Sequence, residues 1–192
     1  FAVTRDESHR VSSIHDLDVN EIKKGVIAES WMRIHIERDF ISDDLSGVVA
    51  GLARVLADVR KAVNDWLAMR KKAIEVSGDL RRMPPVGIDQ EDLDESIALL
   101  DWLTQDSFTF VGYREYDLVD VDGEDALHPV HGTGLGVLRT NDKQDLSHSF
   151  AVLPPAARVR AREKSLLVLS KANSRSTVHR PAYLDYIGVK KF

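Results

Sequence analysis

The sequence predicts an α+β protein in which helices flank an antiparallel sheet. One strand-like segment and two amphipathic helices come first, and short runs with strand periodicity then follow from Phe108 to the end of the chain. This separation of helices from strands is typical of the α+β class. At 192 residues, with 43% hydrophobic and 30% charged side chains, the chain is long enough to bury a core.

The first half of the chain contains one predicted strand and one long predicted helix. Residues 29–38 (ESWMRIHIER) alternate apolar and polar side chains, as a half-buried strand does. Ser42 followed by two aspartates predicts a helix N-terminus. The apolar side chains of this helix form one stripe: Leu45, Val48, Val49, Leu52, Val55, Leu56, Val59, Val63, Trp66 and Met69. We expect it to end near Ser77-Gly78, where a linker over residues 77–88 begins.

A second predicted helix opens the C-terminal part. Asp89 is its expected N-cap, and the helix covers residues 91–104. One face carries the apolar side chains that we expect in the core: Leu93, Ile97, Leu100 and Leu103.

The strands follow this helix. Asp122-Gly123 predicts the tight turn of a hairpin within residues 108–130. Residues 139–149 are polar and predict a loop. Three strand-like runs close the chain, at residues 165–171, 174–181 and 182–192.

Charge is distributed unevenly along the chain. Residues 151–192 hold nine Lys/Arg and two Asp/Glu, whereas residues 1–150 hold 17 and 29. The candidate interface or effector-binding residues of the basic end are Lys171, Arg175, His179, Arg180, Tyr183 and Tyr186. Three interpretations remain open: pairing with acidic surface of this or a neighbouring domain, a pocket for a small anion, or nucleic-acid binding. The net charge of -5 argues against nucleic acid.

Other motifs do not predict a catalytic or metal site. The GTGLG run at residues 132–136 lacks the third glycine of the dinucleotide fingerprint. Glycines of a turn or bulge are the better interpretation. The GVLRT run that starts at Gly136 has strand character. His128 and His131 form a close pair without a third clustered ligand. Ser174, Ser176 and His179 lack the sequence context of a hydrolase nucleophile and have no identifiable orienting acid. We therefore expect no catalytic residue, no cofactor and no metal in this chain.

Composition also indicates the compartment of the protein and argues against a membrane span. The chain has no cysteine, which fits a reducing cytoplasm. Its apolar runs are too short to span a membrane. It begins with Phe1 rather than Met and ends directly after a strand-like run, so we expect it to be a piece of a longer protein.

Several motifs resemble the N-terminal regulatory region of the large NAD-dependent glutamate dehydrogenases of bacteria. They are LLDWLTQDSFTFVGYREYDL at residues 99–118, GTGLGVLR at 132–139 and LSKANSRSTVHRPAYLDYIGVKKF at 169–192. The segments SWMRIHIERDF and VLADVRKAVNDWLAMRKK resemble the same region, and the STVHRP run is the most specific element.

The resemblance implies the end of an ACT-like module with a connecting helix over residues 1–76, and a PAS-like domain with an antiparallel sheet over residues 89–192. It also implies a parent enzyme that deaminates L-glutamate to 2-oxoglutarate and ammonium with NAD. The catalytic lysine, catalytic aspartate and Rossmann fold of that family have no counterpart here. The implied role is regulation or assembly, with other domains and subunits of a homo-oligomer as partners. The alternative is a module that senses an amino acid or another small anion.

Overall fold

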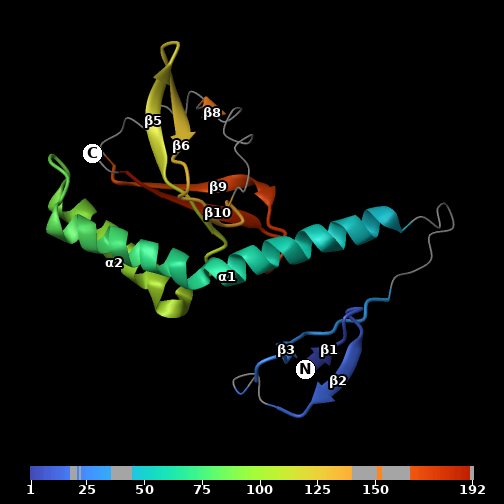
Figure 1. Ribbon diagram of the computed structural model, residues 1–192. Helices are drawn as coiled ribbons and strands as arrows, with labels where there is room; N and C mark the ends of the chain where they lie inside the picture. Colours follow the sequence, from blue (N-terminus) through green and yellow to red (C-terminus); the bar gives the residue numbers. More distant parts are fainter. Residues whose placement is uncertain (18–20, 22, 36–44, 140–150, 153–164, 191–192) are drawn as a thin grey trace. The chain divides into compact units, whose positions relative to one another are not determined.

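A computed structural model describes residues 1–17, 21, 23–35, 45–139, 151–152 and 165–190 (Figure 1). The chain divides into two compact units, Phe1–Leu45 and Ser46–Phe192, called unit 1 and unit 2 below. No helix in the described residues is both long enough and apolar enough to cross a membrane.

Unit 1 contains a three-stranded antiparallel sheet that the sequence analysis did not predict. Its strands are β1 (Ala2–Arg5), β2 (Val11–His15) and β3 (Ile27–Ala28), in the order β2-β1-β3. These strands are two to five residues long, which leaves too little alternation for a periodicity argument. Their pairing depends on contacts between residues far apart in sequence, such as Val3 with Ile27.

A charged cluster holds unit 1 together next to this sheet. Arg5 donates to both carboxylate oxygens of Glu29, through Nε at 2.5 Å and through its terminal nitrogen at 2.7 Å. Trp31 Nε1 donates to the same carboxylate at 2.8 Å. The hydrogen bonds from Arg5 and then Trp31 lower the pKa of Glu29 to about 2, because they stabilise its ionised form.

The predicted strand over residues 29–38 is wrong in its described part. Residues 30–35 lie outside any strand, and Met32 and Ile34 are 68% and 60% exposed. Alternation indicates a two-sided ribbon, but a strand also needs a neighbouring backbone to pair with. Residues 36–38, and the predicted helix cap at residues 42–44, lie outside the described residues.

Unit 2 is built on one long helix, α1 (Ser46–Arg82), and a shorter one, α2 (Gln90–Trp102). Helix α1 continues past the predicted end at Ser77-Gly78, so the first half of the expected linker is helical. The buried Ser77 explains this extension: its Oγ donates to Asp101 of α2 at 2.7 Å and accepts from Arg81 at 2.8 Å. These bonds fix the last turns of α1 against α2.

The predicted start of α2 is confirmed. Asp89 has extended backbone angles, and its side chain accepts from the backbone N–H of Glu91 at 2.9 Å. The helix ends two residues earlier than predicted, and a π-helical turn, η2 (Leu103–Ser107), follows. Asp106 in this turn has a left-handed φ of 60°.

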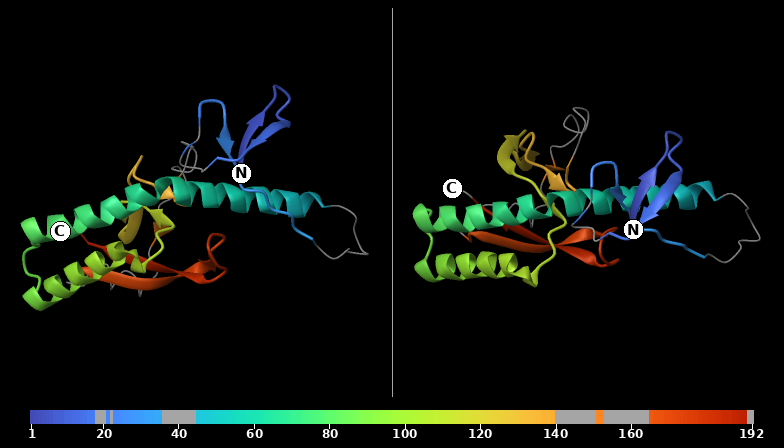
Figure 2. Two further views of the ribbon diagram at one scale, coloured as in Figure 1. Left: turned by 90° about the horizontal axis from the view of Figure 1, so that it is seen from below. Right: turned by 60° about the horizontal axis from the view of Figure 1, so that its bottom comes forward.

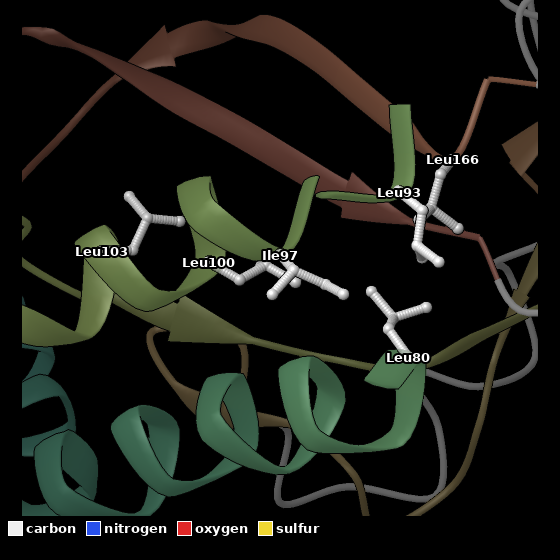
Figure 3. Close-up of a cluster of buried hydrophobic side chains, with 6 residues drawn as sticks. All are labelled: Leu80, Leu93, Ile97, Leu100, Leu103 and Leu166. Atoms are coloured by element: carbon white, nitrogen blue, oxygen red, sulfur yellow. The ribbon is translucent and has the colours of Figure 1, made fainter. Parts of the chain in front are cut away.

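The core of unit 2 lies where both helices meet the C-terminal strands (Figure 3). Six buried side chains form it: Leu80, Leu93, Ile97, Leu100, Leu103 and Leu166. All four residues predicted for the buried face of the second helix are among them. Ile187 and Val189 of the last strand pack against this cluster, so the core anchors the basic end of the chain.

The strands of unit 2 form small antiparallel sheets. Strands β5 (Tyr116–Val121) and β6 (Glu124–Pro129) make a hairpin, and β8 (Ala151–Val152) pairs with β6. The predicted turn is confirmed, because Asp122 and Gly123 both have left-handed φ values, 55° and 84°. Strand β4 (Gly112–Tyr113) pairs with β7 (Leu135–Gly136).

The last two strands are β9 (Leu167–Arg175) and β10 (Tyr183–Val189), which pair as a hairpin. Two predicted strand runs are correct only at their first residues, Ser174–Arg175 in β9 and Gly136 in β7. Residues 176–181 form the turn of this hairpin, and Val137 and Leu138 lie in a turn after β7. In both places the backbone forms hydrogen bonds within a few residues, as a turn does. A composition rich in β-formers does not distinguish such a turn from a strand. The polar loop predicted over residues 139–149 lies, except for Arg139, outside the described residues.

The α+β class is confirmed, with helices and antiparallel sheets throughout the described chain. The described strands are divided among four small sheets of two or three strands. The PAS-like and ACT-like assignments stay predictions. The compact units divide between Leu45 and Ser46, so α1 lies in unit 2. The predicted domain boundaries at residues 76 and 89 stay predictions.

Candidate functional site

The β9–β10 hairpin carries the six candidate residues of the basic end, and it lies beside α1 and α2 (Figure 2). Lys171 lies opposite Asp185 on the neighbouring strand, and its Nζ forms an ion pair with that carboxylate. Arg175 lies opposite Tyr183, and its guanidinium carbon is 5.5 Å from the centre of the tyrosine ring. This distance permits a cation–π contact. Both cations therefore have a partner within the hairpin.

The turn of the hairpin, residues 176–182, is held by its own hydrogen bonds. Ser176 N donates to Ala182 O at 2.8 Å, and Ser176 Oγ accepts from Val178 N at 3.0 Å. His179 has a left-handed φ of 71°, a conformation that costs a non-glycine residue on the order of 1–3 kcal/mol. The bonded turn supplies the constraint that keeps His179 in this conformation.

Contacts with α1 fix this turn on unit 2. Thr177 Oγ1 donates to Asp58 Oδ2 at 3.1 Å, and Val178 is 8% exposed. His179 and Arg180 are exposed. In this turn Val178 is therefore buried, Thr177 is exposed but bonded to α1, and the side chains of His179 and Arg180 are exposed.

Tyr186 lies opposite Ser170, one position along the hairpin from the Lys171–Asp185 pair. Its ring covers Gly188, where an added Cβ would be 3.0 Å from Tyr186 Cε1. The side chain is 43% exposed, and burial of its hydroxyl end, with Tyr116 nearby, raises the pKa of Tyr186. Of the six predicted residues, Lys171 pairs with Asp185 and Arg175 pairs with Tyr183. His179 and Arg180 lie on the exposed turn, and Tyr186 covers Gly188.

The GTGLG run has a structural partner that sequence analysis missed. Asp65 of α1 is 5% exposed, and its Oδ2 accepts from the backbone N–H of Gly136 at 2.8 Å. Its Oδ1 pairs with the guanidinium of Arg139. The only sequence signal was the position of Asp65 beside the apolar stripe of a helix. Nothing in the sequence near Asp65 predicts that this carboxylate is buried, because its partners lie far along the chain.

Gly136 is tightly enclosed in this arrangement. It has a φ of 60°, and a Cβ at this position would lie 2.3 Å from Val111 O and 3.0 Å from Met69 Sδ. Gly132, at the start of the run, has a φ of 78° and open space around it. The prediction of a turn glycine is confirmed at Gly132, whereas Gly136 allows close packing of β7 against α1.

His128 and His131 were the close histidine pair noted in the sequence. Among the described residues, no group of three or more His, Cys, Asp or Glu side chains is placed to hold a metal ion.

The chain was compared with known proteins. It is 32% identical over 195 residues to the NAD-specific glutamate dehydrogenase of Halomonas elongata, an alignment that covers all of this chain and 12% of the relative. The enzyme of the same name from Pseudomonas aeruginosa is 32% identical over 169 residues, covering 88% of this chain and 10% of the relative. That from Mycobacterium tuberculosis is 26% identical over 170 residues, covering 86% of this chain and 9% of the relative.

No family model and no solved structure matches the chain. The chain spans about one eighth of the length of the first relative, so it corresponds to a small part of these enzymes. The resemblance predicted from the sequence motifs is confirmed: the chain is homologous, along its whole length, to a segment of the bacterial NAD-specific glutamate dehydrogenases.

Proposed function

We propose that the chain is a non-catalytic regulatory or assembly segment of a large NAD-specific glutamate dehydrogenase. The observation that carries this proposal is the alignment of the whole chain with only 12% of a relative of that name. The parent reaction would convert L-glutamate, NAD and water to 2-oxoglutarate, ammonium and NADH, in the cytoplasm. NAD and the catalytic residues would belong to another part of the parent enzyme.

The environment of the GTGLG run supports a non-catalytic role. In a dinucleotide site, glycine backbone N–H groups face the pyrophosphate at a helix N-terminus. Here the N–H of Gly136 is bound by the Asp65 carboxylate, and Val111 and Met69 occupy the space beside it. A buried carboxylate at this position would repel a phosphate.

The test of this proposal is glutamate-dependent reduction of NAD by the purified chain. We expect no formation of NADH above a sample without protein, while the parent enzyme, assayed in parallel, reduces NAD. A glutamate-dependent rate that rises with the concentration of the chain would contradict the proposal.

Within this role, His179 and Arg180 are the side chains best placed to meet a partner. They are exposed on a turn that is fixed to α1 through Thr177 and Asp58. A neighbouring domain or subunit with an acidic surface would meet Arg180 without first having to order the turn. A small anionic effector is the alternative ligand for the same turn.

Charge reversal of Arg175 and Arg180 tests this surface. In the parent enzyme, Arg175→Glu with Arg180→Glu should weaken subunit association or the response to an effector by roughly 3- to 10-fold, because rim charges contribute modestly to binding. Sedimentation and steady-state kinetics measure the two effects.

The matched control reverses Arg60 and Lys71 of α1, an exposed and a largely exposed cation in unit 2. The proposal is contradicted if the Arg175/Arg180 variant leaves oligomerisation and kinetics unchanged, or if the control variant changes them equally. Arg175 and Arg180 would then be ordinary surface charges.

A further inference from the structure

Three polar side chains on one side of α1 each contact a different segment of unit 2. They are Asp58, Asp65 and Lys72, and we call them the polar row. Their spacing of seven residues places them on the same side of the helix, in steps of about 10 Å. Asp58 contacts the turn of the β9–β10 hairpin, Asp65 contacts β7, and Lys72 contacts the chain between β4 and β5. Segments far apart in the sequence are therefore attached to one helix.

The first contact of the polar row attaches the exposed turn to α1. The tip of the β9–β10 hairpin reaches the helix (Figure 1), where Thr177 Oγ1 donates to Asp58 Oδ2 at 3.1 Å. Lys61 of the same helix lies 3.7 Å from the other oxygen of Asp58. Asp58 therefore keeps a cationic partner if the threonine hydroxyl is removed, so this bond can be deleted without leaving an unpaired carboxylate.

The second contact is the most tightly packed of the three. The side chain of Asp65 is 6% exposed and accepts from the N–H of Gly136 at 2.8 Å. A Cβ added at Gly136 would lie 3.0 Å from Met69 Sδ and 2.3 Å from Val111 O. Side chains packed this closely resist small displacements, so β7 either keeps its place on α1 or separates from it.

The third contact holds the same small sheet as the second. Lys72 Nζ lies 3.7 Å from Glu115 Oε1, and that oxygen accepts from the hydroxyl of Tyr113 in β4 at 2.8 Å. Strand β4 pairs with β7. The polar row therefore connects two parts of unit 2, the exposed turn at one end and the β4–β7 sheet at the other.

We propose that the polar row couples the exposed turn to the β4–β7 sheet, so that a ligand which stabilises the turn also stabilises the sheet. The contacts lie on one continuous helix, so a displacement of α1 at Asp58 has to be accommodated at Asp65, where the packing resists it. The inference rests on the proposed function in one respect, because it takes the turn with His179 and Arg180 as the binding place. Coupling of this kind is reciprocal, so a change in the sheet must also affect the turn.

Amide hydrogen exchange of this chain tests the coupling without any ligand. Thr177→Val keeps the shape of the side chain and removes its bond to Asp58. The N–H groups of Gly136 and Val137 are hydrogen-bonded to Asp65 and to Val111. We expect their exchange to become about fivefold faster, measured relative to residues 97–100 of α2, which corresponds to a weak allosteric coupling.

The reverse experiment perturbs the sheet and observes the turn. Asp65→Asn should accelerate exchange of the N–H groups of Ser176 and Val178, which are bonded within the turn, again relative to residues 97–100. The matched control is Lys71→Met. Lys71 lies on the same helix outside the polar row, and its side chain is 77% exposed, so this change should leave both sets of N–H groups unaffected.

Two results would overturn the coupling. If Thr177→Val accelerates exchange in the turn alone, or Asp65→Asn leaves the turn unchanged, the contacts along α1 are independent. If either variant accelerates exchange equally in residues 97–100, the effect is a general loss of stability and not a coupling. Neither measurement involves NAD or a ligand, so this inference and the proposed function fail separately.

Discussion

Replacing Asp65 with alanine is expected to destabilise unit 2 by about 3 kcal/mol, because a buried hydrogen-bonded ion pair loses one partner. The change leaves the N–H of Gly136 without its acceptor and removes the carboxylate that pairs with Arg139. Urea denaturation followed by far-UV circular dichroism measures the effect, since the described helices α1 and α2 both lie in unit 2.

Two further variants separate the contributions of Asp65. Asp65→Asn keeps an oxygen that can accept from Gly136 but loses the charge that pairs with Arg139, so we expect an intermediate loss of stability. Glu75→Ala removes exposed ion pairs with Lys71 and Lys72 of the same helix and should cost at most about 0.5 kcal/mol. A loss for Asp65→Ala as small as that for Glu75→Ala would show that this contact does not hold β7 on α1.

Replacing Gly136 with alanine is expected to cost about 3 kcal/mol or more. The residue has a left-handed φ of 60°, which alone costs an L-residue roughly 1–2 kcal/mol. The added Cβ would also lie 2.3 Å from Val111 O. That carbonyl accepts from Val137 N at 2.8 Å, so it cannot move away without losing a hydrogen bond, and overpacking adds roughly 1–3 kcal/mol.

Gly132→Ala is the matched control for this prediction. Gly132 has a φ of 78°, but a Cβ added there would have no other atom within 4 Å. Only the left-handed conformation should therefore be penalised, at about 1 kcal/mol. Equal midpoints of urea denaturation for the two variants would mean that close packing at Gly136 contributes nothing.

Local signals in the sequence predicted the elements whose causes are local. Asp89 caps α2 because its own side chain reaches the N–H of Glu91. Asp122-Gly123 makes the β5–β6 turn because both residues tolerate left-handed φ. The helical spacing of the apolar residues in α2 identified which of its faces is buried.

Elements that depend on distant partners were missed or misread. The sheet of unit 1 joins short strands, and residues 30–35 alternate in polarity without a backbone to pair with. The STVHRP run has strand-like composition, yet Ser176 bonds back to Ala182 and forms a turn. Helix α1 runs to Arg82 because Ser77 and Arg81 bind Asp101 across the helix pair.

The candidate site, too, has features with local causes and features that depend on distant partners. The sequence by itself determined the α+β class, the buried face of α2, the basic C-terminal end and the resemblance to a dehydrogenase segment, because composition, periodicity and motifs are carried by neighbouring residues. Only the tertiary structure decided that Lys171 and Arg175 have cross-strand partners and that His179 and Arg180 are exposed. It also brought Asp65 to Gly136 across 71 residues, because burial and long-range pairing are fixed only when the whole chain packs.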